Sequence, residues 1–169
     1  GMSVSQASYA LATFGLVGGI STLLIGGRIV DFLFQRGITD AHYRYYAVGG
    51  LVLALFGGAA HLSSSPTGFF LLMAPAFFPL GMGAIGASAV QLVTPPGLRG
   101  RVSAIYLLAV ALIGMSAGPS FIGLMTDYIF RDPQAIGMAM ALTFGIVGVI
   151  VTMLFLYGMS AMRRAVAQV

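Results

Sequence analysis

The chain has 169 residues, of which 59% are hydrophobic and 7% charged, with a mean hydropathy of +0.99 and no cysteine. A soluble domain carries about 25% charged residues, so this composition excludes a soluble enzyme, a disordered linker and a disulfide scaffold. The charged residues are eight arginines and four aspartates, a net charge of +4. The arginines lie in short gaps between long apolar runs, which argues against a nucleic-acid partner and indicates a polytopic membrane protein.

Five stretches are apolar and free of charge over about 20 residues, the length that a helix needs to cross a bilayer. Backbone groups in lipid must be bonded internally, and no barrel-type alternation occurs, so we expect these stretches to be helices. The expected spans cover about residues 7–27, 45–62, 69–93, 102–126 and 134–160. The predicted fold is an all-α, polytopic membrane protein with five transmembrane helices, forming a single membrane domain over residues 1–169.

The arginines indicate how these spans are oriented. Taking the loops on alternate sides puts seven arginines on one side and Arg131 alone on the other. The positive-inside rule then puts residues 28–44, residues 99–101 and the tail from Arg163 in the cytoplasm. We expect an integral protein of the bacterial inner (cytoplasmic) membrane, with its N-terminus outside and its C-terminus cytoplasmic. An odd number of helices in that orientation, without a signal peptide, indicates that a further segment precedes this one.

Small residues recur along every span, where they let helix backbones approach each other in lipid. The packing candidates of the fourth span are Gly114, Gly118, Pro119 and Gly123. Prolines remove backbone donors, so Pro119 and the third span's Pro75 and Pro79 are expected to kink their helices.

The spans hold no aspartate, glutamate, lysine or arginine away from their ends. Because ionisable residues at membrane depth usually mark proton relays and ion sites, this segment is not expected to carry a coupling step. No cluster has metal-ligand spacing, and no serine has a nearby histidine to activate it. We expect no metal, no cofactor and no enzymatic activity. His42, in the first loop, and His61, near the opposite interface, are expected to be structural or solvated groups.

Two parts of the sequence resemble the major facilitator superfamily of transporters. The GRIVD segment at 27–31, with RG at 36–37, resembles the loop between the second and third helices of that family, and again between the eighth and ninth. The segments at 95–104, 113–119 and 123–128 carry R-G-x-x-S-A, G-x-x-x-G-P and G-L-x-x-D-Y pieces similar to spinster-like members. The resemblance implies that the five spans are the eighth to twelfth helices of a twelve-helix transporter, whose N-terminal half is missing here. Phe32 departs from the pattern, which has a basic residue there.

The resemblance further implies secondary active transport of a small organic solute by alternating access of two halves. The first, third and fourth spans would then face the central cavity, and the second and fifth would face lipid. The substrate-pathway candidates are Ser88, Gln91, Tyr106, Ser116 and Ser120. Two alternatives stay open: Gln91 bonds to loop backbone, and the serines bond to carbonyls of their own helices.

The loops supply gating candidates, namely Gly27, Arg28, Asp31, Arg36, Arg99 and Arg101. Asp31 stands at a membrane–water boundary, where a carboxylate can hold the N-terminus of a neighbouring helix in one transport state and release it in the other. The alternative is a solvated loop that serves only membrane topology. The expected partners are the bilayer, the missing half and a small-molecule substrate. An alternative function is a structural or assembly membrane protein of five helices that transports nothing.

Overall fold

A computed structural model describes residues 3–77, 79 and 82–168 of the chain. The chain is 89% helical, and its described part contains no strand, which confirms the predicted all-α class. Three helices are long and apolar enough to cross a membrane. They are Val4–Gln35, Pro96–Phe130 and Pro133–Val166. The chain therefore has the character of a helical membrane protein, although its helices do not divide clearly into five spans.

Most of the long helices are built from consecutive α-helical and π-helical segments. The first contains α1 (Val4–Ser21), the π-helical η1 (Thr22–Gly26) and α2 (Gly27–Gln35). The second contains α3 (Ala41–Val52), the π-helical η2 (Leu53–Gly57) and α4 (Gly58–His61). The third long helix contains the 3₁₀ segment η4 (Pro96–Leu98), α7 (Arg99–Leu124) and the π-helical η5 (Met125–Phe130). The fourth contains the 3₁₀ segment η6 (Pro133–Ala135) and α8 (Ile136–Val166).

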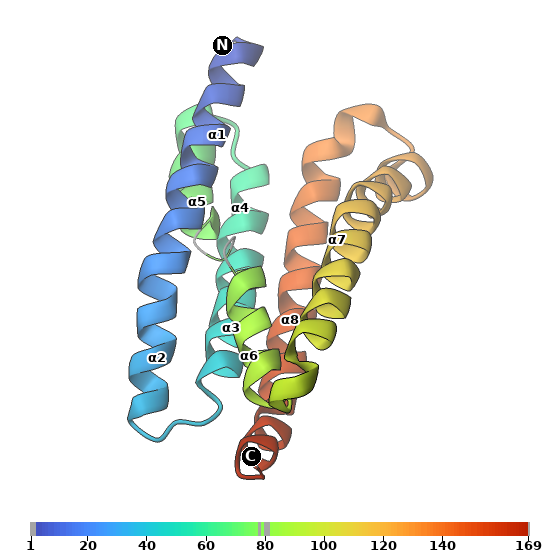
Figure 1. The fold of residues 1–169 in the computed structure, drawn as a ribbon. Coiled ribbons are helices and arrows are strands. Elements are labelled where there is room, and N and C mark those ends of the chain that lie inside the picture. Colours follow the sequence, from blue (N-terminus) through green and yellow to red (C-terminus); the bar gives the residue numbers. More distant parts are fainter. Residues whose placement is uncertain (1–2, 78, 80–81, 169) are drawn as a thin grey trace.

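The third expected span, at 69–93, is not one helix. It consists of α5 (Pro66–Phe77), in the upper part of the bundle in Figure 1, and α6 (Met82–Leu92), in the lower part. Pro75 lies inside α5. A proline removes a backbone donor and crowds the preceding turn, yet α5 continues past Pro75 to Phe77. Pro119 likewise lies within an uninterrupted α7.

The helices extend beyond the apolar stretches that marked them in the sequence. The first continues past Arg28 to Gln35, and α3 starts at Ala41, so the loop expected at 28–44 is reduced to a short turn. Gly37 closes that turn with a φ of 84°, the left-handed conformation that glycine adopts at helix ends. Its amide bonds the carbonyl of Phe34, and the amide of Ile38 bonds that of Leu33. The length of an apolar stretch reflects the thickness of the membrane core, whereas the capping residues determine where the helix ends.

The tightest packing joins α3 to α8, which run in opposite directions (Figure 1). A Cβ at Gly50 would meet Thr152 and the Gly148 carbonyl at under 3 Å, so the two backbones touch. The Thr152 hydroxyl donates to the Ala47 carbonyl across the seam at 3.1 Å. Further along, Phe155 stacks on Tyr46 with ring centroids 4.5 Å apart. This α3–α8 seam is the centre of the fold.

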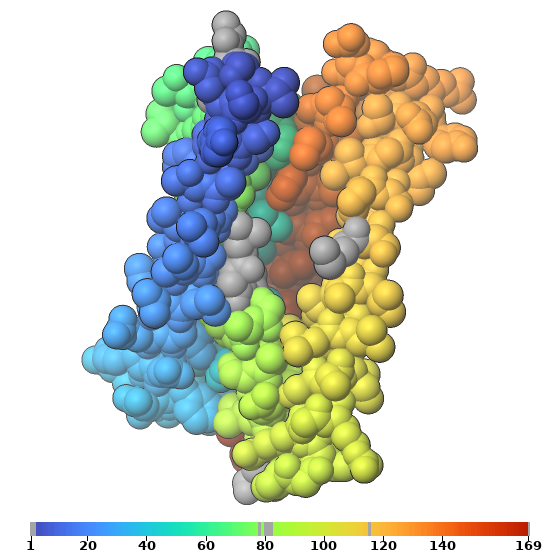
Figure 2. Space-filling view, turned by 45° about the horizontal axis from the view of Figure 1, so that its top comes forward, coloured from blue at the N-terminus to red at the C-terminus, as the bar shows by residue number. Residues whose placement is uncertain are grey.

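The remaining long helices leave large faces uncovered. α1 packs mainly on α5, while α7 contacts α6 at one end and α8 at the other. Figure 2 shows α1–α2 and α7 standing apart on one face, with α6 between their lower parts. The second helix is well buried where it meets its neighbours, yet Val48, Leu51 and Leu55 on its outer side are exposed. Whether that side faces lipid stays a prediction.

Candidate functional site at the arginine-rich end

One end of the bundle gathers most of the charge. At the lower end in Figure 1, α2 and α6 end, α3 and α7 begin, and α8 reaches its C-terminus. These segments and the turn after α2 carry seven of the eight arginines, and Arg131 lies at the other end, after η5. The helix directions therefore put seven arginines at one end of the bundle and Arg131 at the other, as the sequence predicted. That the arginine-rich end lies on the cytoplasmic side of a membrane stays a prediction.

Asp40 is the centre of an ion cluster at this end. Its side chain is only 1% exposed. The Nε of Arg44 donates to Asp40 Oδ1 at 3.0 Å, and Nη1 of Arg163 lies 3.3 Å from Oδ2. Both arginine side chains are about half exposed, at 48% and 53%. Asp40 precedes α3 directly, the usual place for a helix-capping carboxylate, but its side chain makes no capping bond.

This cluster ties the turn after α2 to the end of α8. Sequence reasoning missed it, although the i, i+4 spacing of Asp40 and Arg44 is a recognisable signal for an ion pair on a helix. Nothing local in the sequence indicates Arg163 as the second partner. Asp40 with Arg44 and Arg163 forms the only ion pairs within residues 3–77, 79 and 82–168.

His42 lies beside this cluster, in the first turn of α3 rather than in a loop, and it is buried, which agrees with the structural one of its two expected roles. Its Nε2 is 3.3 Å from Ser88 Oγ, and the Ser88 hydroxyl donates to the Ile85 carbonyl at 2.7 Å. This bonding pattern assigns the ring proton to Nε2, which donates to Ser88. Burial lowers the pKa of His42 below its usual 6.5, and the charge of Asp31 opposes that shift.

Three of the five substrate-pathway candidates meet neighbouring helices. Ser88 contacts α3 through His42, and Gln91 Nε2 donates to Ser103 Oγ on α7 at 3.1 Å. The hydroxyl of Tyr106 donates to the Gly83 carbonyl at 3.3 Å. Gln91 thus bonds a side chain of the next helix, not the loop backbone that was its alternative.

The other two candidates stay apart from this group. Ser116 and Ser120 are exposed on α7, and the Ser120 hydroxyl donates to the Ser116 carbonyl of its own helix at 2.8 Å. This is the alternative in which a serine bonds its own helix. Ser120 also lines a largely apolar groove of about 650 Å³ between α7 and α8, together with Gly114 and Gly118.

The expected packing glycines of α7 have no close neighbour among the described residues. A Cβ added at Gly114, Gly118 or Gly123 would find no atom within 4 Å. Their packing role therefore stays a prediction that concerns a molecule or segment outside the described residues.

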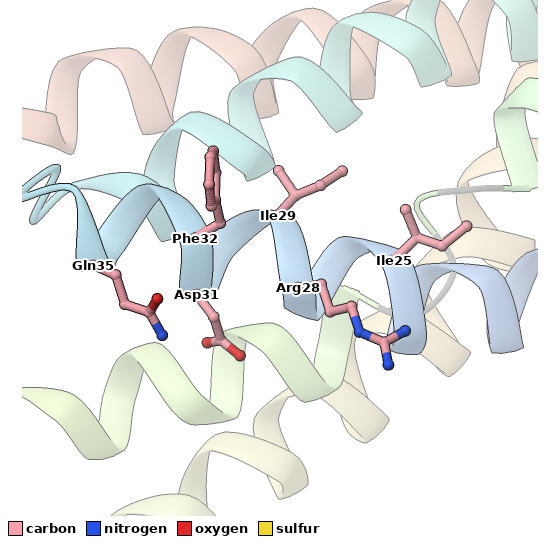
Figure 3. Close-up of a pocket in the computed structure, with 6 residues that line it drawn as sticks. All are labelled: Ile25, Arg28, Ile29, Asp31, Phe32 and Gln35. Atoms are coloured by element: carbon pink, nitrogen blue, oxygen red, sulfur yellow. The ribbon is translucent and has the colours of Figure 1, made fainter.

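The gating candidates do not form one cluster. Asp31, Arg28 and Gln35 point to one side of the first long helix, and Ile25, Ile29 and Phe32 point to the other side. All six line an open hollow of about 580 Å³ (Figure 3). Among the described residues Asp31 makes no ion pair.

The remaining loop arginines have separate surroundings. The guanidinium of Arg36 lies 4.1 Å from the ring centroid of Phe32, the residue that departs from the family pattern. Arg99 Nε donates to the Thr94 carbonyl at 3.1 Å. Arg101 is exposed at the start of α7, and a Cβ at Gly27 would meet open space.

The fold and this arginine-rich end define a class, a helical membrane protein with a polar cluster at one end of its bundle. No protein-family model matches the chain, and no curated protein or solved structure matches it either. Among the described residues, no three side chains of His, Cys, Asp or Glu are grouped so that they could hold a metal ion.

Proposed function

We propose that this chain is the C-terminal part of a secondary transporter of the major facilitator type, spinster-like, which moves a small organic solute by alternating access. The proposed protein lies in the bacterial cytoplasmic membrane with the arginine-rich end in the cytoplasm. In this proposal α5 and α6 are two parts of one interrupted crossing, which makes five crossings. Interrupted helices are common where transporters build their pathways.

The observation that carries the proposal is the large uncovered surface of α1–α2 and α7. The chain exposes 10413 Å², whereas a compact protein of its 17.5 kDa mass exposes about 7,900 Å². The difference is similar to one partner's share of a large permanent interface, about 1,000–2,500 Å². No residue is buried in the most apolar stretch of the helix that contains α7. These helices correspond to two of the three that would face the missing half and the cavity.

The polar side chains fit the same assignment. Ser88 and Gln91 on α6 and Ser116 and Ser120 on α7 are exposed, although polar groups in a lipid-facing position are costly. A solute pathway between two halves would give these groups polar partners. The α3–α8 seam would form the outer, scaffolding side of the half.

The first test is the reading frame upstream of the codon for Gly1. Seven further hydrophobic spans continuous with this chain are expected. A stop codon directly before Met2 would contradict the proposal and favour a five-helix protein that assembles with other membrane proteins. Solute counterflow in proteoliposomes of the full-length protein then measures transport directly.

The gate is tested with Asp31→Asn in that full-length protein. A contact between Asp31 and a helix N-terminus is worth roughly 0.5–2 kcal/mol, enough to shift the balance of inward-open and outward-open forms by up to about thirty-fold. We expect lower transport at equal membrane abundance. Asp132→Asn is the matched control because asparagine can keep the capping bond to the Gln134 amide, 2.9 Å long in the structure. Normal transport by Asp31→Asn would leave Asp31 as a solvated loop residue.

A further inference from the structure

Arg44 and Arg163 are two guanidiniums fixed side by side at a membrane boundary. Both contact the carboxylate of Asp40, at 3.0 and 3.3 Å, so they are close neighbours. Two positive charges against one negative charge leave the cluster with a net charge of +1. Each guanidinium has five N–H donors, and about half of each side chain is exposed. Donors therefore remain on the outer side for another acceptor.

The buried carboxylate also holds these two side chains in place. A free arginine loses considerable rotamer entropy when it binds a ligand. Here part of that cost has been met on folding, because Asp40, 1% exposed, accepts a hydrogen bond from Arg44 and forms an ion pair with Arg163. The pair is thus organised in advance for an anion that accepts from two guanidiniums at once.

Each arginine stands at the end of an exposed apolar stripe. Val48, Leu51 and Leu55 follow Arg44 at steps of four, three and four residues, which keeps them on one helix face. On α8, Leu156 and Val149 precede Arg163 at steps of seven residues, which also keeps one face. All five apolar side chains are exposed, by 44% to 61%. The two stripes flank the α3–α8 seam and extend from the arginine pair along the bundle.

We propose that this surface binds one anionic phospholipid, with its phosphate on Arg44 and Arg163 and its acyl chains along the two stripes. The charge selects an anionic headgroup over a zwitterionic one, since the cluster keeps one positive charge unneutralised. The stripes select a lipid over a soluble phosphate, because they offer hydrocarbon contact directly beyond the guanidiniums. Another helix of this composition would satisfy the stripes but would offer few acidic groups to the arginines. The inference requires only that the chain lies in a membrane, so it is independent of transport.

The test is native mass spectrometry of the purified chain, released from detergent in the presence of equal amounts of phosphatidylglycerol and phosphatidylcholine. We expect one phosphatidylglycerol retained in preference to phosphatidylcholine. Arg44→Gln and Arg163→Gln should each reduce that preference by about fivefold, the usual effect of one basic residue near an anionic surface. Arg131→Gln, which removes the same charge at the opposite end, is the matched control and should bind like the wild type.

Three results would overturn the proposal. They are equal retention of the two lipids, unchanged preference in both Gln variants, and displacement of phosphatidylglycerol by excess inorganic phosphate, which would show that the hydrocarbon contact contributes nothing. Circular dichroism checks that each variant keeps its helices. If a Gln variant unfolds, Arg163→Lys replaces it, because lysine keeps the charge beside Asp40 but loses the planar fork. Because lysine keeps the charge, this variant should still prefer phosphatidylglycerol but retain less of it than the wild type, and wild-type retention would refute a site built on two guanidiniums.

Discussion

Replacing Asp40 by asparagine tests whether the ion cluster stabilises the fold. Asparagine keeps the size of the side chain but removes its charge and turns one acceptor into a donor that faces a guanidinium. Two contacts weaken, and a hydrogen bond to a charged group contributes about 1.5–3 kcal/mol. Removing one member of a fully buried pair costs about 3–5 kcal/mol. Arg44 and Arg163 are half exposed, so water can solvate the donors they release. We therefore expect a net loss of about 2 kcal/mol in the free energy of unfolding.

The measurement is reversible unfolding in mixed detergent micelles, with helicity followed as the fraction of denaturing detergent rises. Asp31→Asn is the matched control: it removes the same charge from an exposed side chain that makes no ion pair, so it should stay within about 0.5 kcal/mol of the wild type. A double-mutant cycle of Asp40→Asn with Arg163→Gln should give a coupling energy of about 1 kcal/mol. Equal stability of the two Asn variants, or strictly additive effects in the cycle, would refute the reasoning.

Three further predictions follow from the fold. In this cysteine-free chain, cysteines introduced at Thr39 and Ser64 should react with impermeant reagents from opposite sides of the membrane, and labelling from one side would contradict the topology. Gly148→Leu should destabilise the bundle by about 1–3 kcal/mol or more, because a Cβ there meets backbone of α3, whereas Gly145→Leu, with open space at its Cβ, should be tolerated in the same unfolding assay. Burial lowers the pKa of His42, so stability should be full above about pH 6.5 and fall as pH drops through that value, when the unfolded chain takes up the proton first. A His42→Gln variant should lose this pH dependence, and a wild-type curve that is flat between pH 7.5 and 5 would show that the buried ring does not control it.

The sequence predicted the helical class because hydrophobic length is a strong signal in lipid. It predicted helix ends poorly, since polar residues such as Arg28 can continue a helix into water. The end of the first helix depends instead on Gly37, whose left-handed backbone allows two capping bonds. The third span was predicted as one helix because its composition is apolar throughout, although its prolines already indicated kinks.

For the candidate site, the sequence likewise predicted some features and missed others. Ser88, Gln91 and Tyr106 could be singled out because polar side chains are rare in apolar helices. The partners of these residues could not be identified from the sequence, since Gln91 meets Ser103 only through the packing of α6 on α7. Asp40 was missed because a carboxylate next to a loop arginine has no local sign of burial. Its second ion-pair partner, Arg163, is distant in the sequence and comes close only after α8 has packed.

The α3–α8 seam also constrains the order in which the protein can be assembled. Chains emerge from the ribosome N-terminus first, so α3 enters the membrane long before α8 exists. Until then Asp40 has Arg44 as its ion-pair partner but not Arg163, and the groove at Gly50 has no backbone to fill it. Of the helices in residues 3–77 and 82–168, the one made last, α8, is therefore the one that closes the centre of the bundle. Chains interrupted before α8 would carry an open seam and an incompletely paired carboxylate, features that quality-control proteases could recognise in the bilayer.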